Sequence, residues 1–129
     1  MPPSDYRAAA QFRAELRRFL RRSEDCAREH GLTPRQHLLL LQIAGADDGV
    51  ATVSSLVESL ALTQSAVTEL VQRAEAAGLV ARAPSGTDGR VVHLSLTGEG
   101  RRRLDRVHTA LGPERAHLKR VVDALDGAT

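Results

Sequence analysis

Apolar side chains recur at helical spacing through most of the chain. Between residues 4 and 30 they return every three or four positions, which predicts one long amphipathic helix with Ser4 as its N-cap and Gly31 as its stop. The segment "TPRQ", residues 33–36, predicts a second helix, because Thr and Gln three positions apart form a capping box around a proline. This second helix is expected to be buried and to end at Ala44.

Two short helices joined by a tight turn are predicted next. Residues 51–53 indicate a very short strand, and Thr52 is placed to cap the first short helix. Thr63 follows a turn and is placed to cap the second. The apolar positions are Leu56, Val57 and Leu60 in the first helix, and Val67, Leu70, Val71 and Ala74 in the second, which Gly78 ends.

The periodicity then changes to two. Residues 79–83 and 91–96 are short β-rich runs, and Val92, Leu94 and Leu96 are expected on one face, so a β-hairpin is predicted. Thr97 caps a further helix, and a break at Gly112 and Pro113 separates it from the last one. The apolar faces of these two helices are Leu104, Val107, His108 and Leu111, then Leu118, Val121, Val122 and Leu125.

Two helices, a turn of about three residues and a hairpin make a winged helix-turn-helix. The expected fold is therefore mainly α with a small β-hairpin wing, in a single domain of residues 1–129. Residues 33–97 are expected to form the winged module, and residues 4–31 and 98–126 the dimerisation helices.

Composition supports a globular, non-exported chain. The 129 residues are 42% hydrophobic and 26% charged, and the longest aliphatic block, Leu38 to Leu41, is too short to cross a membrane. A single cysteine, Cys26, excludes an intrachain disulfide. We expect a cytoplasmic protein with no membrane partner. The formal charge of +2 permits nucleic-acid binding without requiring it.

The second short helix has two contrasting faces. Opposite its apolar stripe stand short polar groups near the helix start, which suit the reading of base edges in the major groove. The alternative interpretation is a solvated helix face, and the neighbouring helix and hairpin favour the reading role. The candidate DNA-binding residues of this helix are Gln64, Ser65, Thr68, Glu69, Gln72 and Arg73.

The segment "SGTDGR", residues 85–90, forms the tip of the predicted hairpin. Its two glycines permit backbone angles that other residues resist, and Asp88 can orient Arg90. An arginine on a narrow loop suits the minor groove, so Asp88 and Arg90 join the candidate DNA-binding residues. An exposed turn arginine that contacts only water is the alternative.

The terminal helices lie outside the winged module, and their apolar stripes need a partner. Pairing across a two-fold axis would cover them and would also set the spacing of two half-sites, whereas packing within one protomer is the alternative. The predicted dimer-interface residues are Phe12, Leu16, Phe19, Leu111, Leu118, Val121, Val122 and Leu125.

Three motifs carry a family resemblance. They are "LTPRQHLLLLQIAG", "ATVSSLVESLALTQSAVTELVQRAEAAGLVAR" and, most specifically, "TDGRVVHLSLTGEG". Over residues 32–106 the chain resembles the MarR family of bacterial winged helix-turn-helix transcription regulators. The resemblance implies a homodimeric repressor of a pseudo-palindromic double-stranded DNA operator, released by a small effector that the sequence does not identify. It also implies that the helix from Gln64 to Arg73 enters the major groove and Arg90 the minor groove.

The chain departs from the family pattern at three positions. Glu69 stands where the family often has arginine, Ala74 where it often has leucine, and Ala61 where it often has glycine. Residues 51–93 hold three arginines against four acidic residues, so nonspecific phosphate affinity should be modest. Arginines of the terminal helices are another source of phosphate contacts. A winged-helix protein-interaction module with weak or no DNA binding is the alternative function.

Family ligands usually lie between the dimer helices and the winged module. Cys26, His37 and His108 come from elements that can converge there, and a redox- or zinc-responsive regulator using them is a further alternative. They are too few for the family's zinc sensors, so neither a metal nor a cofactor is expected. No nucleophile–base pair or phosphate loop appears, so an enzyme is not expected.

Overall fold

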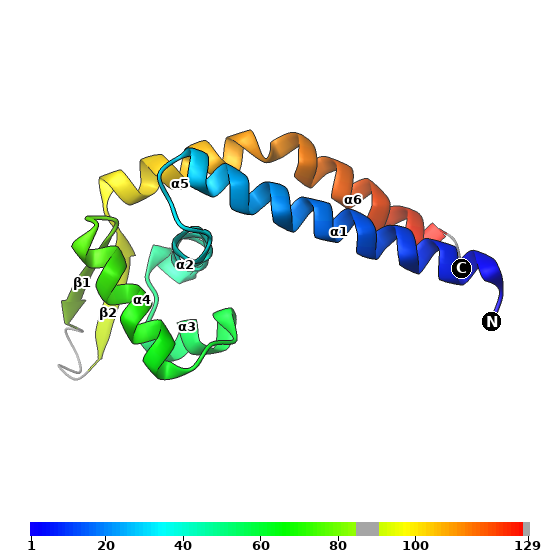
Figure 1. Ribbon diagram of the computed structural model, residues 1–129. Helices are drawn as coiled ribbons and strands as arrows, with labels where there is room; N and C mark the ends of the chain where they lie inside the picture. The colour runs from blue at the N-terminus through cyan, green and yellow to red at the C-terminus, as the bar shows by residue number, and fades with distance from the viewer. Residues whose placement is uncertain (85–90, 128–129) are drawn as a thin grey trace.

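The computed structural model describes residues 1–84 and 91–127. Figure 1 shows a long arm of paired helices with a small module at one end. The helices are α1 (Pro3–Glu29), α2 (Pro34–Ala44), α3 (Val53–Leu60), α4 (Gln64–Ala76), α5 (Gly98–Ala110) and α6 (Gly112–Gly127), with a 3₁₀ turn at Asp47–Gly49. The strands are β1 (Val80–Pro84) and β2 (Val92–Leu96).

The module is a winged helix-turn-helix, which confirms the predicted fold class. Strands β1 and β2 pair antiparallel, with Val80 opposite Leu96 and Pro84 opposite Val92. The strand expected at residues 51–53 is reduced to a single bridge, in which Ala51 and Leu94 exchange backbone hydrogen bonds of 2.9 and 2.8 Å. This bridge attaches the start of α3 to the hairpin.

Threonine side chains begin the helices of the module as predicted. Thr33 with Gln36 and Thr52 with Ser55 form capping boxes, and the Thr63 hydroxyl accepts a 3.1 Å hydrogen bond from the Ala66 amide. Each cap satisfies backbone amides that have no partner within the helix. Because each threonine fixes where its helix starts, the sequence alone located α2, α3 and α4.

The start of α1 differs from the prediction. The helix begins at Pro3, Pro2 occupies the N-cap position, and no side chain caps it. Proline suits the first helical position because its fixed φ fits the helix and its missing N–H has no intrahelical acceptor there. The proposed cap at Ser4 was therefore wrong.

The core of the module joins all of its elements. It is closed by leucines and valines from α2, α3, α4, both strands and α5, and the β2 side chains Val92, Leu94 and Leu96 face it as predicted. The α4 stripe of Val67, Leu70, Val71 and Ala74 is fully or almost fully buried. Helix α4 is thus fixed in the core by one face, and its other face is exposed.

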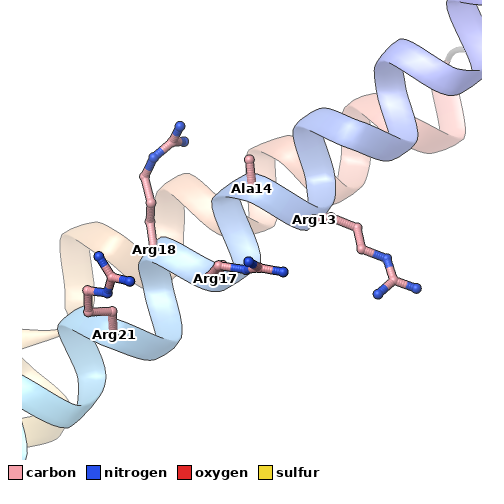
Figure 2. Close-up of a pocket in the computed structure, with 5 residues that line it drawn as sticks. All are labelled: Arg13, Ala14, Arg17, Arg18 and Arg21. Atoms are coloured by element: carbon pink, nitrogen blue, oxygen red, sulfur yellow. The ribbon is translucent and has the colours of Figure 1, made fainter.

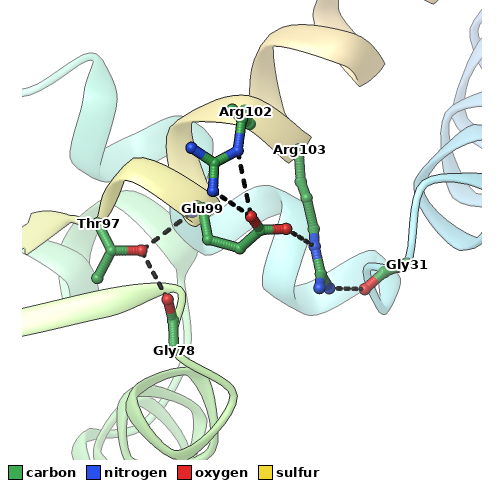
Figure 3. Close-up of polar contacts among 7 residues, drawn as sticks. Gly31, Gly78, Thr97, Glu99, Arg102 and Arg103 are labelled. Carbon is green, nitrogen blue, oxygen red and sulfur yellow. Dashed lines mark hydrogen bonds and ion pairs between the residues drawn. The ribbon is translucent and has the colours of Figure 1, made fainter.

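Two hydrogen bonds from Thr97 hold the start of α5 against the module, and Figure 3 shows the one from its hydroxyl to the Gly78 carbonyl. Thr97 Oγ1 accepts from the Gly100 amide and donates to the Gly78 carbonyl at 2.6 Å, while the Thr97 amide donates to the Leu79 carbonyl at 3.1 Å. Gly100 comes so close to β1 that a Cβ there would lie 2.1 Å from the Leu79 carbonyl oxygen. Only glycine permits this approach.

The arm consists of α1 and α6, which lie side by side and antiparallel (Figure 1). Within residues 1–84 and 91–127, no helix combines the length and the apolar character needed to cross a membrane.

Candidate nucleic-acid interface

Helix α4 presents the predicted reading residues on one surface. Gln64, Ser65, Glu69, Gln72 and Arg73 are exposed, and Thr68 is half-buried. Five of the six, Gln64, Ser65, Thr68, Glu69 and Gln72, line the same surface hollow. The structure therefore brings these side chains together at the helix start, and their contact with DNA bases stays a prediction.

The first turn of α4 favours an anion. Its amides point outward at the Thr63 cap, and it carries no acidic residue. Because the helix dipole is positive at this end, a phosphate group is stabilised there. Polar donors and acceptors beside a positive helix end are what a base-reading helix requires.

Two side chains of this face are paired with each other. Arg73 Nη2 lies 2.6 Å from Glu69 Oε1, and the side chains are 73% and 62% exposed. Exposed pairs of this kind contribute little to stability. The pairing nevertheless balances the Glu69 charge and occupies the Arg73 guanidinium.

A second ion pair connects the first strand of the wing to α4. Arg82 on β1 binds Glu75 near the end of α4, and this hydrogen bond raises the pKa of Arg82. Asp88 and Arg90, the residues predicted at the wing tip, lie outside the described residues. Their role stays a prediction.

The arginines of the arm do not lie beside α4. Arg13, Arg17, Arg18 and Arg21 line a surface pocket on α1, and Figure 2 shows their guanidinium groups spread around the helix. Figure 1 shows α1 leading away from α4. Of these four, only Arg18 has an acidic partner among the described residues, Glu15 at 2.6 Å. These four arginines thus form a basic patch that is separate from α4.

Three residues predicted for an effector pocket lie in different surroundings. Cys26 is fully buried, and burial raises the pKa of its thiol. His37 is buried, and burial together with nearby His108 lowers its pKa. His108 is exposed, which corrects its placement on the apolar face of α5.

These three residues do not form a metal-ligand set. The described residues that bring ligand atoms within 4.8 Å of one another are Cys26, Glu29 and His30. The sequence analysis missed Glu29 and His30. The signal that could have found them is their spacing of three and four positions from Cys26 on one helix.

The predicted dimer residues are unequally available. Leu111 and Val121 are 3% and 9% exposed, so packing within the protomer already covers them. Phe12, Leu16, Phe19, Leu118 and Leu125 are half-buried, and Val122 is exposed. The prediction omitted Tyr6 and Leu20, which are 64% and 50% exposed. The free apolar surface of the arm is therefore concentrated on α1.

Sequence comparison identifies the module. Residues 30–91 match the model of the MarR family. The chain is 38% identical over 72 residues to the HTH-type transcriptional repressor MdtR of Bacillus subtilis (strain 168). That alignment covers 56% of this chain and 45% of the relative, so the chain spans less than half the length of the curated relative it matches.

Solved structures share the fold. AbsC, a MarR family transcriptional regulator from Streptomyces coelicolor, superposes with a TM-score of 0.72 at 20% identity, covering 97% of this chain and 82% of AbsC. A cysteine-to-serine mutant of MarR from E. coli, complexed with operator DNA, gives 0.70 at 22% identity, covering 85% and 78%. These structures share the winged helix fold that the sequence motifs predict.

Proposed function

We propose that the protein is a sequence-specific DNA-binding transcription regulator that acts as a homodimer, because residues 30–91 match the model of the MarR family. The observation that carries the proposal is the division of α4 into two faces. One face is locked in the core, and the other presents Gln64, Ser65, Thr68, Glu69 and Gln72 around one hollow. The matched repressor and the operator-bound MarR structure support the same function.

The proposed contacts follow from side-chain chemistry. Gln64 pairs with an adenine edge, Ser65 and Thr68 bond to bases or phosphates, and Glu69 accepts from a cytosine amino group. Arg90, oriented by Asp88, enters the adjacent minor groove. The amides at the start of α4 bind a phosphate and fix the helix in its groove.

The dimer is proposed to form through the arm. Tyr6, Leu20 and Val122 expose apolar surface there, and a two-fold axis between two arms would cover it. Two reading helices would then meet a pseudo-palindromic operator with half-sites about 10 base pairs apart. Repression, with release by a small effector, is the proposed mode of control.

The experiment for DNA reading starts from selection of bound fragments from random or genomic DNA. Gln64→Ala and Thr68→Ala should then change the sequence preference, with about 1–3 kcal/mol lost at one or two base positions. Gln42→Ala, at an exposed glutamine of α2, is the matched control and should leave preference and affinity unchanged. Equal weakening on every sequence would refute base reading by these side chains.

The dimer is tested with a pair of leucines of nearly equal exposure. Leu20 on α1 is 50% exposed and Leu38 on α2 is 47% exposed. Leu20→Glu should shift the mass in light scattering from dimer to monomer, while Leu38→Glu should stay dimeric. A monomeric wild-type protein at micromolar concentration would overturn the proposal.

One observation favours a second function, a module that binds another protein. Glu69 places a carboxylate on the reading face, and residues 51–93 contain more acidic residues than arginines. Selection that recovers no DNA sequence above background at low salt would favour this function.

A further inference from the structure

The end of α1 gathers three groups that bind metal ions. Cys26, Glu29 and His30 lie at i, i+3 and i+4, so they share one face of the helix. Their ligand atoms all lie within 4.8 Å of one another, and Cys26 Sγ is 3.8 Å from His30 Nδ1. With Zn–S near 2.3 Å and Zn–N near 2.0–2.1 Å, a tetrahedral ion holds such atoms roughly 3.6 Å apart. Thiol and imidazole are already close to that spacing.

A second helix supplies a carboxylate that shares Arg22 with this cluster, and its side chain is 37% exposed. Glu114 Oε2, at the start of α6, is a buried oxygen for which the described part of the chain provides no hydrogen-bond donor. Its other oxygen, Oε1, lies 3.7 Å from Arg22 Nε. A buried acceptor without a donor is costly and marks a place where a ligand fits.

Arg22 links this carboxylate to the three-residue cluster. Besides Glu114, its guanidinium donates to Glu29 Oε1 at 3.0 Å. One cation, the Arg22 guanidinium, thus stands between carboxylates of two helices. Its side chain is 38% exposed and can turn into solvent.

We propose that Cys26, Glu29 and His30 bind a divalent transition-metal ion of the zinc class, with Glu114 as the fourth ligand once Arg22 has turned away. Thiolate and imidazole select such an ion over Mg²⁺ or Ca²⁺. The thiol proton leaves to solvent on binding, because metals bind the thiolate. The thiolate, Glu29 and Glu114 together bring three negative charges to the doubly charged ion, and His30 remains neutral, so the filled site carries one net negative charge.

On metal binding, His30 gives up a hydrogen bond to the backbone and gains a bond to the ion. His30 Nδ1 lies 2.8 Å from the Cys26 carbonyl oxygen, so its N–H donates to that carbonyl when no metal is bound. Metal binding moves this proton to Nε2 and gives Nδ1 to the ion. Since Glu114 belongs to α6, a bound ion ties the end of α1 to the start of α6. This site is independent of the proposed DNA binding.

The test is titration of the full-length, metal-free protein with cobalt(II) chloride, followed by competition with zinc chloride. Binding should give one cobalt per protomer, visible tetrahedral bands and a near-ultraviolet band from sulfur-to-cobalt charge transfer. Cys26→Ser should lose the near-ultraviolet band, and His30→Ala and Glu114→Gln should each weaken binding at least about tenfold. His93→Ala, at an exposed histidine of β2, is the control and should bind normally.

Arg22→Ala gives the sharpest result, because removing the resident cation should tighten cobalt binding. Weaker binding by Arg22→Ala, or absence of a charge-transfer band in the wild-type protein at millimolar cobalt, would overturn the proposal. His30 is only half-buried, so His30→Ala keeps the test decisive if Cys26→Ser fails to fold. No measurement uses DNA, so failure here leaves the proposed regulator function intact.

Discussion

Glu69 and Arg73 form a 2.6 Å ion pair across one turn of α4, on the face proposed to read DNA. A carboxylate on this face repels phosphates. The ion pair also keeps Arg73, the one arginine of the helix, from contacting a phosphate. In the proposed DNA complex, Glu69 would therefore weaken the nonspecific attraction between the helix and DNA.

Glu69→Gln should raise affinity for nonspecific DNA, because it removes the repulsion and frees Arg73 for a phosphate. The slope of log K against log salt concentration should steepen by about one per protomer. Fluorescence anisotropy at several salt concentrations measures both quantities. Glu24→Gln, an equal charge change on the exposed side of α1, should alter neither. An unchanged slope in Glu69→Gln would show that Arg73 contacts no phosphate.

Gly100→Ala should destabilise the protein. Its Cβ would meet the Leu79 carbonyl oxygen at 2.1 Å, and backbone cannot yield as a side chain can. We expect a loss of about 3 kcal/mol, at the upper end of overpacking costs. Gly98→Ala is the control in the same helical turn, because its nearest neighbour would be an Arg102 side-chain nitrogen at 3.7 Å. Urea unfolding of both variants measures the difference, and equal stabilities would contradict the close approach.

Ala61→Gly should stabilise the protein. Ala61 joins α3 to α4 with φ 53° and ψ 43°, a left-handed conformation that strains any residue with a Cβ. Relief of that strain exceeds the extra freedom that glycine gains in the unfolded chain, so we expect a gain of about 0.5–1 kcal/mol. Ala77→Gly, at the right-handed C-cap of α4, lacks this strain and should not stabilise. Thermal and urea unfolding check both, and a loss of stability in Ala61→Gly would contradict the prediction.

His37 should make the protein less stable in mild acid. Burial, with His108 nearby, lowers the pKa of His37 in the folded state. Below the ordinary histidine pKa of about 6.5, His37 is therefore protonated in the unfolded chain and stays neutral in the folded one. The free energy of unfolding should therefore fall as the pH drops from 7 to 5. The fall should be smaller in His37→Gln and unchanged in His93→Gln. Stopping at pH 5 keeps Glu99 ionised, since hydrogen bonds from Arg102 and Arg103 lower its pKa.

Local signals located the winged module from sequence. Thr33, Thr52, Thr63 and Thr97 each cap the helix they were expected to cap, and the α4 stripe is buried as predicted. Capping and amphipathic periodicity depend on residues within one or two turns, so they can be read along the chain. The wrong prediction of a cap at Ser4 also concerns a local signal, because Pro2 and Pro3 determine where α1 begins.

Side-chain environments that depend on tertiary packing could not be predicted. His108 follows Val107 in sequence, yet Val107 is fully buried and His108 is exposed, a difference set by how α5 is rotated against the core. Leu111 was assigned to the dimer because no sequence pattern tells a stripe covered within the protomer from one left free. Glu114 on α6 lies 3.7 Å from Arg22 on α1, and its other oxygen has no hydrogen-bond donor among the described residues. Periodicity cannot predict this contact, because the two residues are far apart in the sequence.

The attachment of α5 at Thr97 and Gly100 has a mechanical consequence. Thr97 forms hydrogen bonds to the Gly78 and Leu79 carbonyls, and the backbone of Gly100 lies directly against that of Leu79. These contacts restrict movement of α5 relative to the end of α4. We therefore expect α5 and α4 to move together as one rigid unit. A small tilt of α5 against the arm would therefore move α4 as well. In the proposed dimer, the distance between the two α4 helices would then be set at the arm, away from the surface proposed to contact DNA.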